Sequence, residues 1–347
     1  MEIGKFFVDA VMAVIGGCLG ASVSALGGFV LLGLAGTGGF IYMLVTGDTA
    51  WISVVGAGIL LKPSSCFLGG VVATAYTRKK NLIQCGKDIG RSLVSFRRMD
   101  ILLAGSLGGL AGYVLNTGLN IFLAGRVDTT ALTIVIISLA LKYVWGMTKT
   151  NDCEASSHAV PSPFRFFDKL SNPVGQIILS VLMGTAAVLV TWLLTLNAAT
   201  APFAGGLMFF FSALSLYVVF LGVPLPPTHH YTGPAGVITV YWLALHGNPS
   251  NFLSAAVLAL WGIAAAAMGM AFCSLMGKLF FDEGDIHVDP PTMGIMLTTA
   301  VCLSLLPLTG VFRTGLLIQG GVGLALIIVS ILFLVFFKMR KRKRTEA

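Results

Sequence analysis

Long apolar runs dominate the sequence and decide which folds are open to it. An α-helix needs about 20 apolar residues to cross the roughly 30 Å hydrocarbon core of a membrane, and several runs reach or approach that length. The runs lie near residues 8–25, 27–46, 50–77, 101–124, 129–147, 174–196, 203–222, 230–246, 252–277, 291–309 and 316–337. Because they do not alternate as barrel strands would, the sequence predicts an all-α integral membrane protein with about 10–12 transmembrane or half-membrane helices.

Composition agrees with this class of protein. Of the 347 residues, 56% are hydrophobic and 10% are charged, whereas about a quarter of residues are charged in an average soluble domain. The mean hydropathy is +0.91. The six cysteines form no CxxC pair and lie mostly inside apolar runs, so we expect them to be small packing residues.

The net charge of +8 is carried by short basic segments and not by one basic face, which argues against a nucleic-acid partner. Two of these segments are residues 78–98 and 338–347. Lysine and arginine gather in cytoplasmic loops, where anionic lipid headgroups attract them. We therefore expect a multi-pass protein of the inner (plasma) membrane, in contact with lipids, with its C-terminus in the cytoplasm.

The run at 50–77 carries an interruption at "LKPSS". Pro63 lacks the N–H that a helix interior requires, and the charge of Lys62 is costly at membrane depth. Two half-helices that meet at Pro63 fit this run better than one continuous span.

A polar linker divides the chain, and the order of features recurs on both sides of it. The expected units are a first transmembrane repeat half (1–147), a cytoplasmic linker (148–173), a second transmembrane repeat half (174–337) and a basic cytoplasmic tail (338–347). The parallel segments are 27–65 with 205–250, and 109–142 with 261–305. In the second pair, a helix of small residues is followed by a polar break with an aspartate and then by an apolar helix.

Counting spans gives the two halves opposite orientations. From the basic segment at 78–98, Asp128 falls outside the cell, whereas Asp289 falls inside when counted back from the C-terminus. The sequence thus predicts an inverted repeat with interrupted helices, the architecture of many secondary transporters.

The segment "PPTHHYTGPAG" contains two adjacent histidines, His229 and His230, between prolines. We expect Gly233 and Pro234 to break the backbone there. Broken backbone at membrane depth is tolerated where it lines a cavity or is buried in protein, and such breaks bind anions at helix N-termini and cations at carbonyl groups. Both imidazoles are therefore candidate substrate or ion ligands.

The segment "DEGDIHVDPPTMG" concentrates charge in a chain that has little. Pro290 and Pro291 suit the first positions of a helix, with Asp289 as its N-cap. In an extended chain, Asp285, His287 and Asp289 would share one side. A histidine between carboxylates can carry a proton near neutral pH or ligate a divalent metal ion.

The alternative for this segment is a solvated loop whose charges only stop the spans from sliding. In the first half the corresponding candidates are Asp48 and Asp128, which have no histidine beside them. We therefore expect the second half to carry most of the ionisable chemistry. The isolated His158 and His246 are expected to be interfacial hydrogen-bonding residues.

Several motifs together resemble a known family. The segments are "PPTHHYTGPAGV", "GDIHVDPPTMGI", "FLGGVVATAY", "KDIGRSL" and "DTTALTIVI". They resemble a family of bacterial and archaeal polytopic membrane proteins that is defined as a domain of unknown function. The resemblance implies the membrane fold and the importance of the motif residues. The chain departs from the family at "KPSS", where members have a glycine-proline-histidine turn, so the resemblance does not support a symmetric pair of histidine sites.

The functional prediction is a permease or channel-like secondary transporter of a small solute or ion, coupled to a proton or cation and without another cofactor. The absence of HExxH, GxxxxGK[ST] and GxSxG motifs agrees with a protein that is not an enzyme. The alternatives are a membrane-embedded enzyme for a lipid or prenyl substrate and a non-catalytic anchoring subunit. Glycine stripes allow close helix packing within one chain or in a homo-oligomer.

Overall fold

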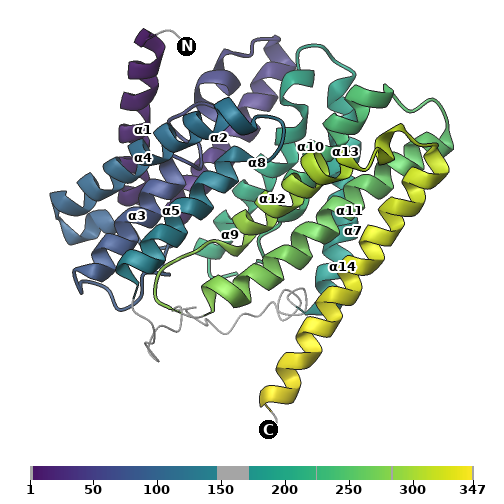
Figure 1. Cartoon of the computed structure of the whole chain (residues 1–347). Coiled ribbons are helices and arrows are strands. Elements are labelled where there is room, and N and C mark those ends of the chain that lie inside the picture. Colours follow the sequence, from purple (N-terminus) through teal and green to yellow (C-terminus); the bar gives the residue numbers. More distant parts are fainter. Residues whose placement is uncertain (1–2, 147–171, 224, 283, 346–347) are drawn as a thin grey trace.

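The computed structural model describes residues 3–146, 172–223, 225–282 and 284–345, with side chains as far as residue 336 (Figure 1). Within these ranges the chain is helical and has no strand; one parallel β-bridge joins Gly86 to Ile286. Most of the predicted linker at 148–173, including His158, lies outside the described residues. So do the side chains of the predicted tail at 338–347, where the backbone continues α14 as far as Thr345.

The helices follow the apolar runs closely. Before the linker lie α1 (Ile3–Val23), α2 (Ala25–Thr46), η1 (Ile52–Gly56), α3 (Cys66–Lys79), η2 (Leu93–Phe96), α4 (Met99–Leu123) and α5 (Thr129–Trp145). After it lie α7 (Pro173–Thr195), η3 (Ala201–Gly206), α8 (Leu207–Ser215), α9 (Tyr217–Phe220), α10 (His229–His246), α11 (Phe252–Met276), η4 (Gly277–Phe281), α12 (Pro290–Ala300), η5 (Val301–Leu305), α13 (Leu306–Leu308), η6 (Val311–Arg313) and α14 (Leu316–Thr345).

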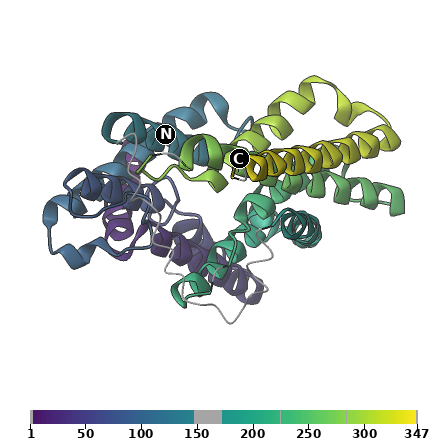
Figure 2. The same ribbon diagram turned by 90° about the horizontal axis from the view of Figure 1, so that it is seen from below.

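Eight helical stretches in the described part are long and apolar enough to cross a membrane, and the apolar α5 is only slightly shorter. They are Ile3–Val23, Ala25–Thr46, Met99–Leu123, Pro173–Thr195, Ala201–Phe220, Phe252–Phe281, Pro290–Leu308 and Leu316–Phe336. The predicted all-α multi-pass membrane fold is thereby confirmed. In both views the helices before the linker occupy one side and α11 and α14 the other (Figures 1 and 2).

The predicted interruption of the run at 50–77 is confirmed. Helix η1 ends at Gly56, and α3 begins only at Cys66. The backbone N–H groups of Ser65 and Cys66 both donate to the carbonyl of Lys62, at 2.8 and 2.9 Å. Pro63 has no N–H with which to continue a helix from the preceding residues, so a new helix starts after this turn.

Helices α5 and α12 lie side by side and run antiparallel. At one end, the backbone N–H of Asp128 donates to the Thr299 hydroxyl at 3.0 Å. At the other end, the Lys142 ammonium donates to the Phe280 carbonyl at 2.5 Å. The start of α5 therefore meets the end of α12, and the end of α5 meets the segment just before α12.

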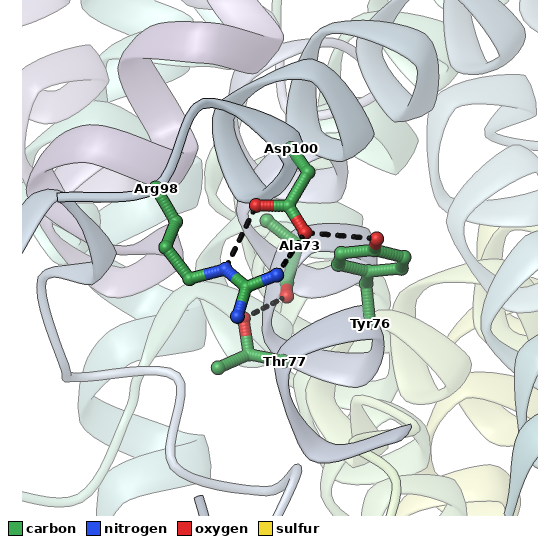
Figure 3. Close-up of polar contacts among 5 residues, drawn as sticks. All are labelled: Ala73, Tyr76, Thr77, Arg98 and Asp100. Carbon is green, nitrogen blue, oxygen red and sulfur yellow. Dashed lines mark hydrogen bonds and ion pairs between the residues drawn. The ribbon is translucent and has the colours of Figure 1, made fainter. Parts of the chain in front are cut away.

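Arg98 fixes the end of the loop between α3 and α4, which we call the α3–α4 loop (residues 80–98) (Figure 3). Its Nε and Nη2 atoms donate to the two carboxylate oxygens of Asp100, at 3.0 and 2.8 Å. The Tyr76 hydroxyl donates to the same carboxylate at 3.1 Å, and the Thr77 hydroxyl donates to the Ala73 carbonyl at 2.7 Å. Since Tyr76 is on α3 and Asp100 on α4, the cluster holds the two ends of the loop together.

The cysteines in the described ranges follow the packing prediction at four of five positions. Cys66 and Cys302 are buried and free, and Cys18 and Cys273 are half-buried and free. The prediction is wrong for Cys85 in the α3–α4 loop, which is disulfide-bonded.

Glycines let α1, α3 and α4 touch backbone to backbone. A Cβ atom on Gly17 would lie 2.2 Å from the carbonyl oxygen of Gly105, and one on Gly69 would lie 2.4 Å from the Cα of Gly17. A Cβ atom on Gly20 would lie 1.9 Å from the carbonyl oxygen of Cys66. Such contacts are closed to every other residue, so the small-residue stripe is a packing requirement within this chain.

Gly17→Ala is expected to lower the free energy of unfolding by about 1–3 kcal/mol, because the new methyl group forces α1 away from α4. The matched control is Gly118→Ala on α4, where nothing lies within 4 Å of the added Cβ. Alanine favours a helix over glycine by up to about 1 kcal/mol, so this control should be neutral or stabilising. Unfolding in mixed micelles measures both. Equal effects of the two changes would contradict the backbone contact.

Candidate functional site

A cavity of about 280 Å³ lies between the helices that precede the linker and those that follow it. Its lining comes from α2, α3 and α5 on one side and from α8, α9, α10 and α12 on the other, with Ile89 of the α3–α4 loop. Most of the lining is apolar. The ionisable side chains that border it are Asp128, His229 and Asp289.

Four helices begin at this cavity. Pro63 and Phe67 belong to the start of α3, and Pro227 and His229 to the start of α10. Helices α5 and α12 contribute the same four positions, counted from the N-cap. The residues are Asp128, Thr130, Ala131 and Ile134 on α5, and Asp289, Pro291, Thr292 and Ile295 on α12.

Asp289 caps α12 as the sequence predicts, and Pro290 and Pro291 occupy the first two helical positions. One carboxylate oxygen accepts from the backbone N–H of Thr292 at 2.9 Å and from the hydroxyl of the same residue. The other lies 3.2 Å from Nε2 of His287. The carboxylate is thus held by its own helix and by the histidine that precedes it.

The segment before α12, residues 282–289, is called the acidic segment below. Asp285, Ile286, His287 and Val288 are all buried, and Asp285 is only 1% exposed. The alternative of a solvated loop is therefore wrong for this stretch, although it describes the exposed Asp282. Burial is not confined to one side either, because Ile286 and Val288 are covered as fully as their polar neighbours.

The ion-pair partner of Asp285 is Arg78, whereas His287 pairs with Asp289. The Asp285 carboxylate lies 3.0 Å from the Nε atom of Arg78, at the end of α3, and both side chains are buried. The ion pair therefore ties the acidic segment to the opposite half of the chain.

The α3–α4 loop covers the acidic segment. The backbone N–H of His287 donates to the Gly86 carbonyl at 3.2 Å, and the Lys87 ammonium donates to the Asp282 carbonyl at 3.3 Å. Burial lowers the pKa of Lys87, while the negative charges of Asp282 and Asp285 oppose that shift. Ile89 of this loop also lines the cavity, so the loop contacts both the acidic segment and the cavity.

His229 and His230 begin α10 and are 6% and 5% exposed. The His229 ring borders the cavity and packs against the rings of Phe29 and Phe209, with ring centres 4.9 and 6.1 Å away. The Nδ1 atoms of both histidines are buried and have no hydrogen-bond partner in the described part of the chain. An imidazole of this kind is available to a ligand.

The prediction that Gly233 and Pro234 break the backbone is wrong. Helix α10 continues through both, and the break lies before His229. Proline at position 234 leaves the carbonyl of His230 without its usual helical donor. Gly269 of α11 packs against that carbonyl, since a Cβ there would lie 2.1 Å from the oxygen. Tertiary packing thus accommodates the proline inside a continuous helix.

In the first half, Asp128 caps α5 by accepting from the backbone N–H of Ala131 at 2.9 Å. It has a favourable charge interaction with Lys62, whose ammonium donates to the Asn116 side chain at 2.7 Å. Asp48 is elsewhere: it is exposed, and its carboxylate accepts from the backbone N–H of Ala50 at 2.8 Å. It does not line the cavity.

His246 has a structural environment. Its Nδ1 and Nε2 atoms lie 3.0 and 2.9 Å from the carbonyl oxygens of Trp242 and Phe312, and its ring stacks on Trp242. The expected role as a hydrogen-bonding residue is confirmed.

The sequence reasoning did not include three parts of the site. Lys62 was noted only as a costly charge, and its partner Asn116 gave no signal beyond being polar inside an apolar run. Arg78 gave only the signal of a basic residue in a loop, although its side chain pairs with the buried Asp285. The rings of Phe29 and Phe209 could not be distinguished from ordinary lipid-facing residues.

A divalent metal ion finds no ready set of ligands. Within the described ranges there is no group of three or more His, Cys, Asp or Glu side chains that could hold one. The site consists of the His287–Asp289 pair, the Asp128 carboxylate and the His229 imidazole, whereas His230 is buried but does not line the cavity.

Comparison with known proteins agrees with the resemblance found in the motifs. The family of unknown function DUF7973 matches residues 3–168 and 174–320, which together are most of the chain. No curated protein and no solved structure matches the chain. The chain belongs to this family of unknown function, DUF7973.

Proposed function

We propose that the protein is a secondary transporter, a permease for a small solute that binds in the cavity between its two halves. The observation that carries this proposal is the convergence of four helix starts, from both sides of the linker, on one cavity with ionisable groups. Interrupted helices around a central site are the usual construction of secondary transporters. The same cavity is of the size that suits a small ligand.

The arrangement of helix contacts supports two related halves, with α14 in addition. Helices α1, α2, α3, α4 and α5 of the first half correspond to α7, α8, α10, α11 and α12 of the second. In the first half α1 packs on α3 and α4, and in the second α7 packs on α10 and α11. Between the halves, α2 packs on α8 and α5 packs on α12. Contacts between corresponding helices are what a two-fold axis produces. The antiparallel course of α5 and α12 supports an axis in the membrane plane, and therefore an inverted repeat.

The contacts also support a relative topology. The α3–α4 loop touches the acidic segment, so both lie on one side of the membrane, and two further spans bring the end of α14 to that side. The basic residues of this loop favour the cytoplasm. The disulfide at Cys85 argues for the opposite side, because disulfides persist in oxidising compartments. We give the charge more weight, since two basic segments agree, and propose a cytoplasmic C-terminus in the cell membrane.

Coupling would run through the pair formed by His287 and Asp289. A histidine beside a carboxylate can take up or release a proton near neutral pH. Its proton would neutralise Asp289 at the edge of the cavity, and loss of that proton would restore the negative charge. The same pair could thus exchange a proton against the solute.

His287→Gln is expected to leave the protein folded and to remove the dependence of transport on a proton gradient, because glutamine can donate to Asp289 but cannot carry the proton. Uptake into proteoliposomes with and without a pH gradient measures this. His246→Gln is the matched control, since His246 lies outside the cavity. A His287→Gln protein whose uptake keeps its full pH dependence would refute coupling at this pair.

A further inference from the structure

We propose that the solute is an organic ammonium ion with an apolar substituent. This inference rests on the proposed transport site and names its substrate class. The first observation is charge: the described lining of the cavity contains two carboxylates, Asp128 and Asp289, and no lysine or arginine. The Lys62 ammonium interacts with Asp128 from outside this lining and is bonded to Asn116.

The positive charge at the helix N-termini does not reverse the preference of the cavity for a cation. Each N-terminus carries about half a positive charge that fades within one turn, and the Asp128 and Asp289 caps already neutralise those of α5 and α12. The starts of α3 and α10 have no side-chain cap. Each of these partial charges is only about half that of a carboxylate, so the carboxylate that the ligand contacts has the larger effect. An anion would therefore meet net repulsion at the Asp289 end of the cavity.

Aromatic rings supply the second observation. Phe29, Phe67 and Phe209 all line the cavity. A cation over an aromatic face is attracted by the electrons of the ring, and this attraction is greatest where water is excluded. Most of the remaining lining consists of leucine, isoleucine, valine, alanine and proline side chains, which suit an apolar substituent.

The unpartnered imidazole is the third observation. His229 is more than nine-tenths buried, lines the cavity and has a free Nδ1 atom. In the neutral ring a nitrogen without a proton can accept from an ammonium N–H. An inorganic ion is a poorer fit, because calcium or magnesium needs about six or more oxygen ligands, and no cluster of three candidate metal ligands occurs in the described part of the chain.

The test uses two series of ligands, and within each series the shape is similar while the charge is positive, zero or negative. The full-length protein in detergent is titrated with 2-phenylethylammonium, 2-phenylethanol and phenylacetate, and with choline, 3,3-dimethylbutan-1-ol and 3,3-dimethylbutanoate. Binding is measured by calorimetry and by the shift of the melting temperature. We expect at least one ammonium ion to bind tenfold or more tightly than its neutral and anionic counterparts.

Two variants, with Asp48→Asn as a control, locate the binding site. Asp289→Asn should weaken ammonium binding at least tenfold while keeping an N-cap acceptor, and Asp48→Asn should leave it unchanged. Phe209→Leu, which keeps the cavity wall apolar, should weaken binding of the ammonium ion by threefold or more and leave binding of the neutral analogue unchanged. Phe209→Leu keeps the test valid if Asp289→Asn does not fold.

The proposal is overturned if the neutral or anionic ligand binds as well as the ammonium ion, or if none of the six binds. These outcomes are separate from failure of the transport proposal. Ammonium binding at the site without exchange across liposomes would support the substrate class and refute transport. Exchange of an anion or neutral solute, without ammonium binding, would support transport and refute the class.

Discussion

Arg78→Met will destabilise the protein by about 3–5 kcal/mol, because it leaves the Asp285 carboxylate buried without the charge that compensates it. The two side chains form an ion pair of 3.0 Å and are 9% and 1% exposed. The double change Arg78→Met with Asp285→Leu should recover most of the loss, since replacing both buried charges by apolar groups is often neutral. Unfolding in mixed micelles measures each free energy.

The control is a second arginine–aspartate pair, at the start of α4. Arg98 binds Asp100 through two nitrogens (Figure 3), but the side chains are 45% and 36% exposed. Solvent screens an exposed pair, so Arg98→Met should have a much smaller effect than Arg78→Met. Equal effects of the two would show that the junction between the α3–α4 loop and the acidic segment does not depend on a buried charge pair.

Asp289→Asn is expected to reduce transport by tenfold or more and to leave the fold intact. Asparagine caps a helix about as well as aspartate does, so the free energy of unfolding should change by about 1 kcal/mol or less. The charge that faces the cavity is lost, and with it the ion-pair partner of His287. A loss of about 1.4 kcal/mol in binding already corresponds to a tenfold effect.

Asp48→Asn is the matched control for this prediction. Asp48 also accepts from a backbone N–H, but it is exposed and does not line the cavity. Initial rates of uptake into proteoliposomes, normalised to the amount of folded protein, measure both variants. If Asp289→Asn transported as fast as Asp48→Asn, the cavity would not be the transport site.

Much of the fold could be predicted because a membrane imposes simple rules on sequence. The length of each apolar run sets a span, and Pro63 interrupts its run through the loss of one backbone donor. The cap at Asp289 with Pro290 and Pro291 is equally local. Each of these features depends on neighbours within a few residues, so the sequence displays it directly.

The parts that could not be predicted depend on contacts between distant segments. Pro234 remains inside α10 because Gly269 of another helix packs against the carbonyl that the proline leaves free. Asp285 pairs with Arg78, far earlier in the chain, and not with its neighbour His287. A charged segment is solvated by default, and this one is buried by the α3–α4 loop together with α3 and α5.

The site was predicted in the same uneven way. His229, Asp128 and Asp289 meet at one cavity, as their breaks in the apolar pattern suggested. Asp48 follows a similar break but is exposed just after the end of α2 and does not line the cavity. The aromatic part of the lining carries no sequence signal, since phenylalanine is common in membrane helices whether it faces lipid, protein or a cavity.

The most direct test of transport through this cavity is the movement of protons, because exchange of one proton for one monovalent cation moves no net charge. Proteoliposomes that enclose a pH-sensitive dye are exposed to concentration jumps of ammonium ions and then to pH jumps. The account predicts saturable changes of internal pH that are present in the parent and in Asp48→Asn and absent in Asp289→Asn. Changes of equal size in all three proteins, or no pH change and no tracer exchange with any solute tested, would contradict it.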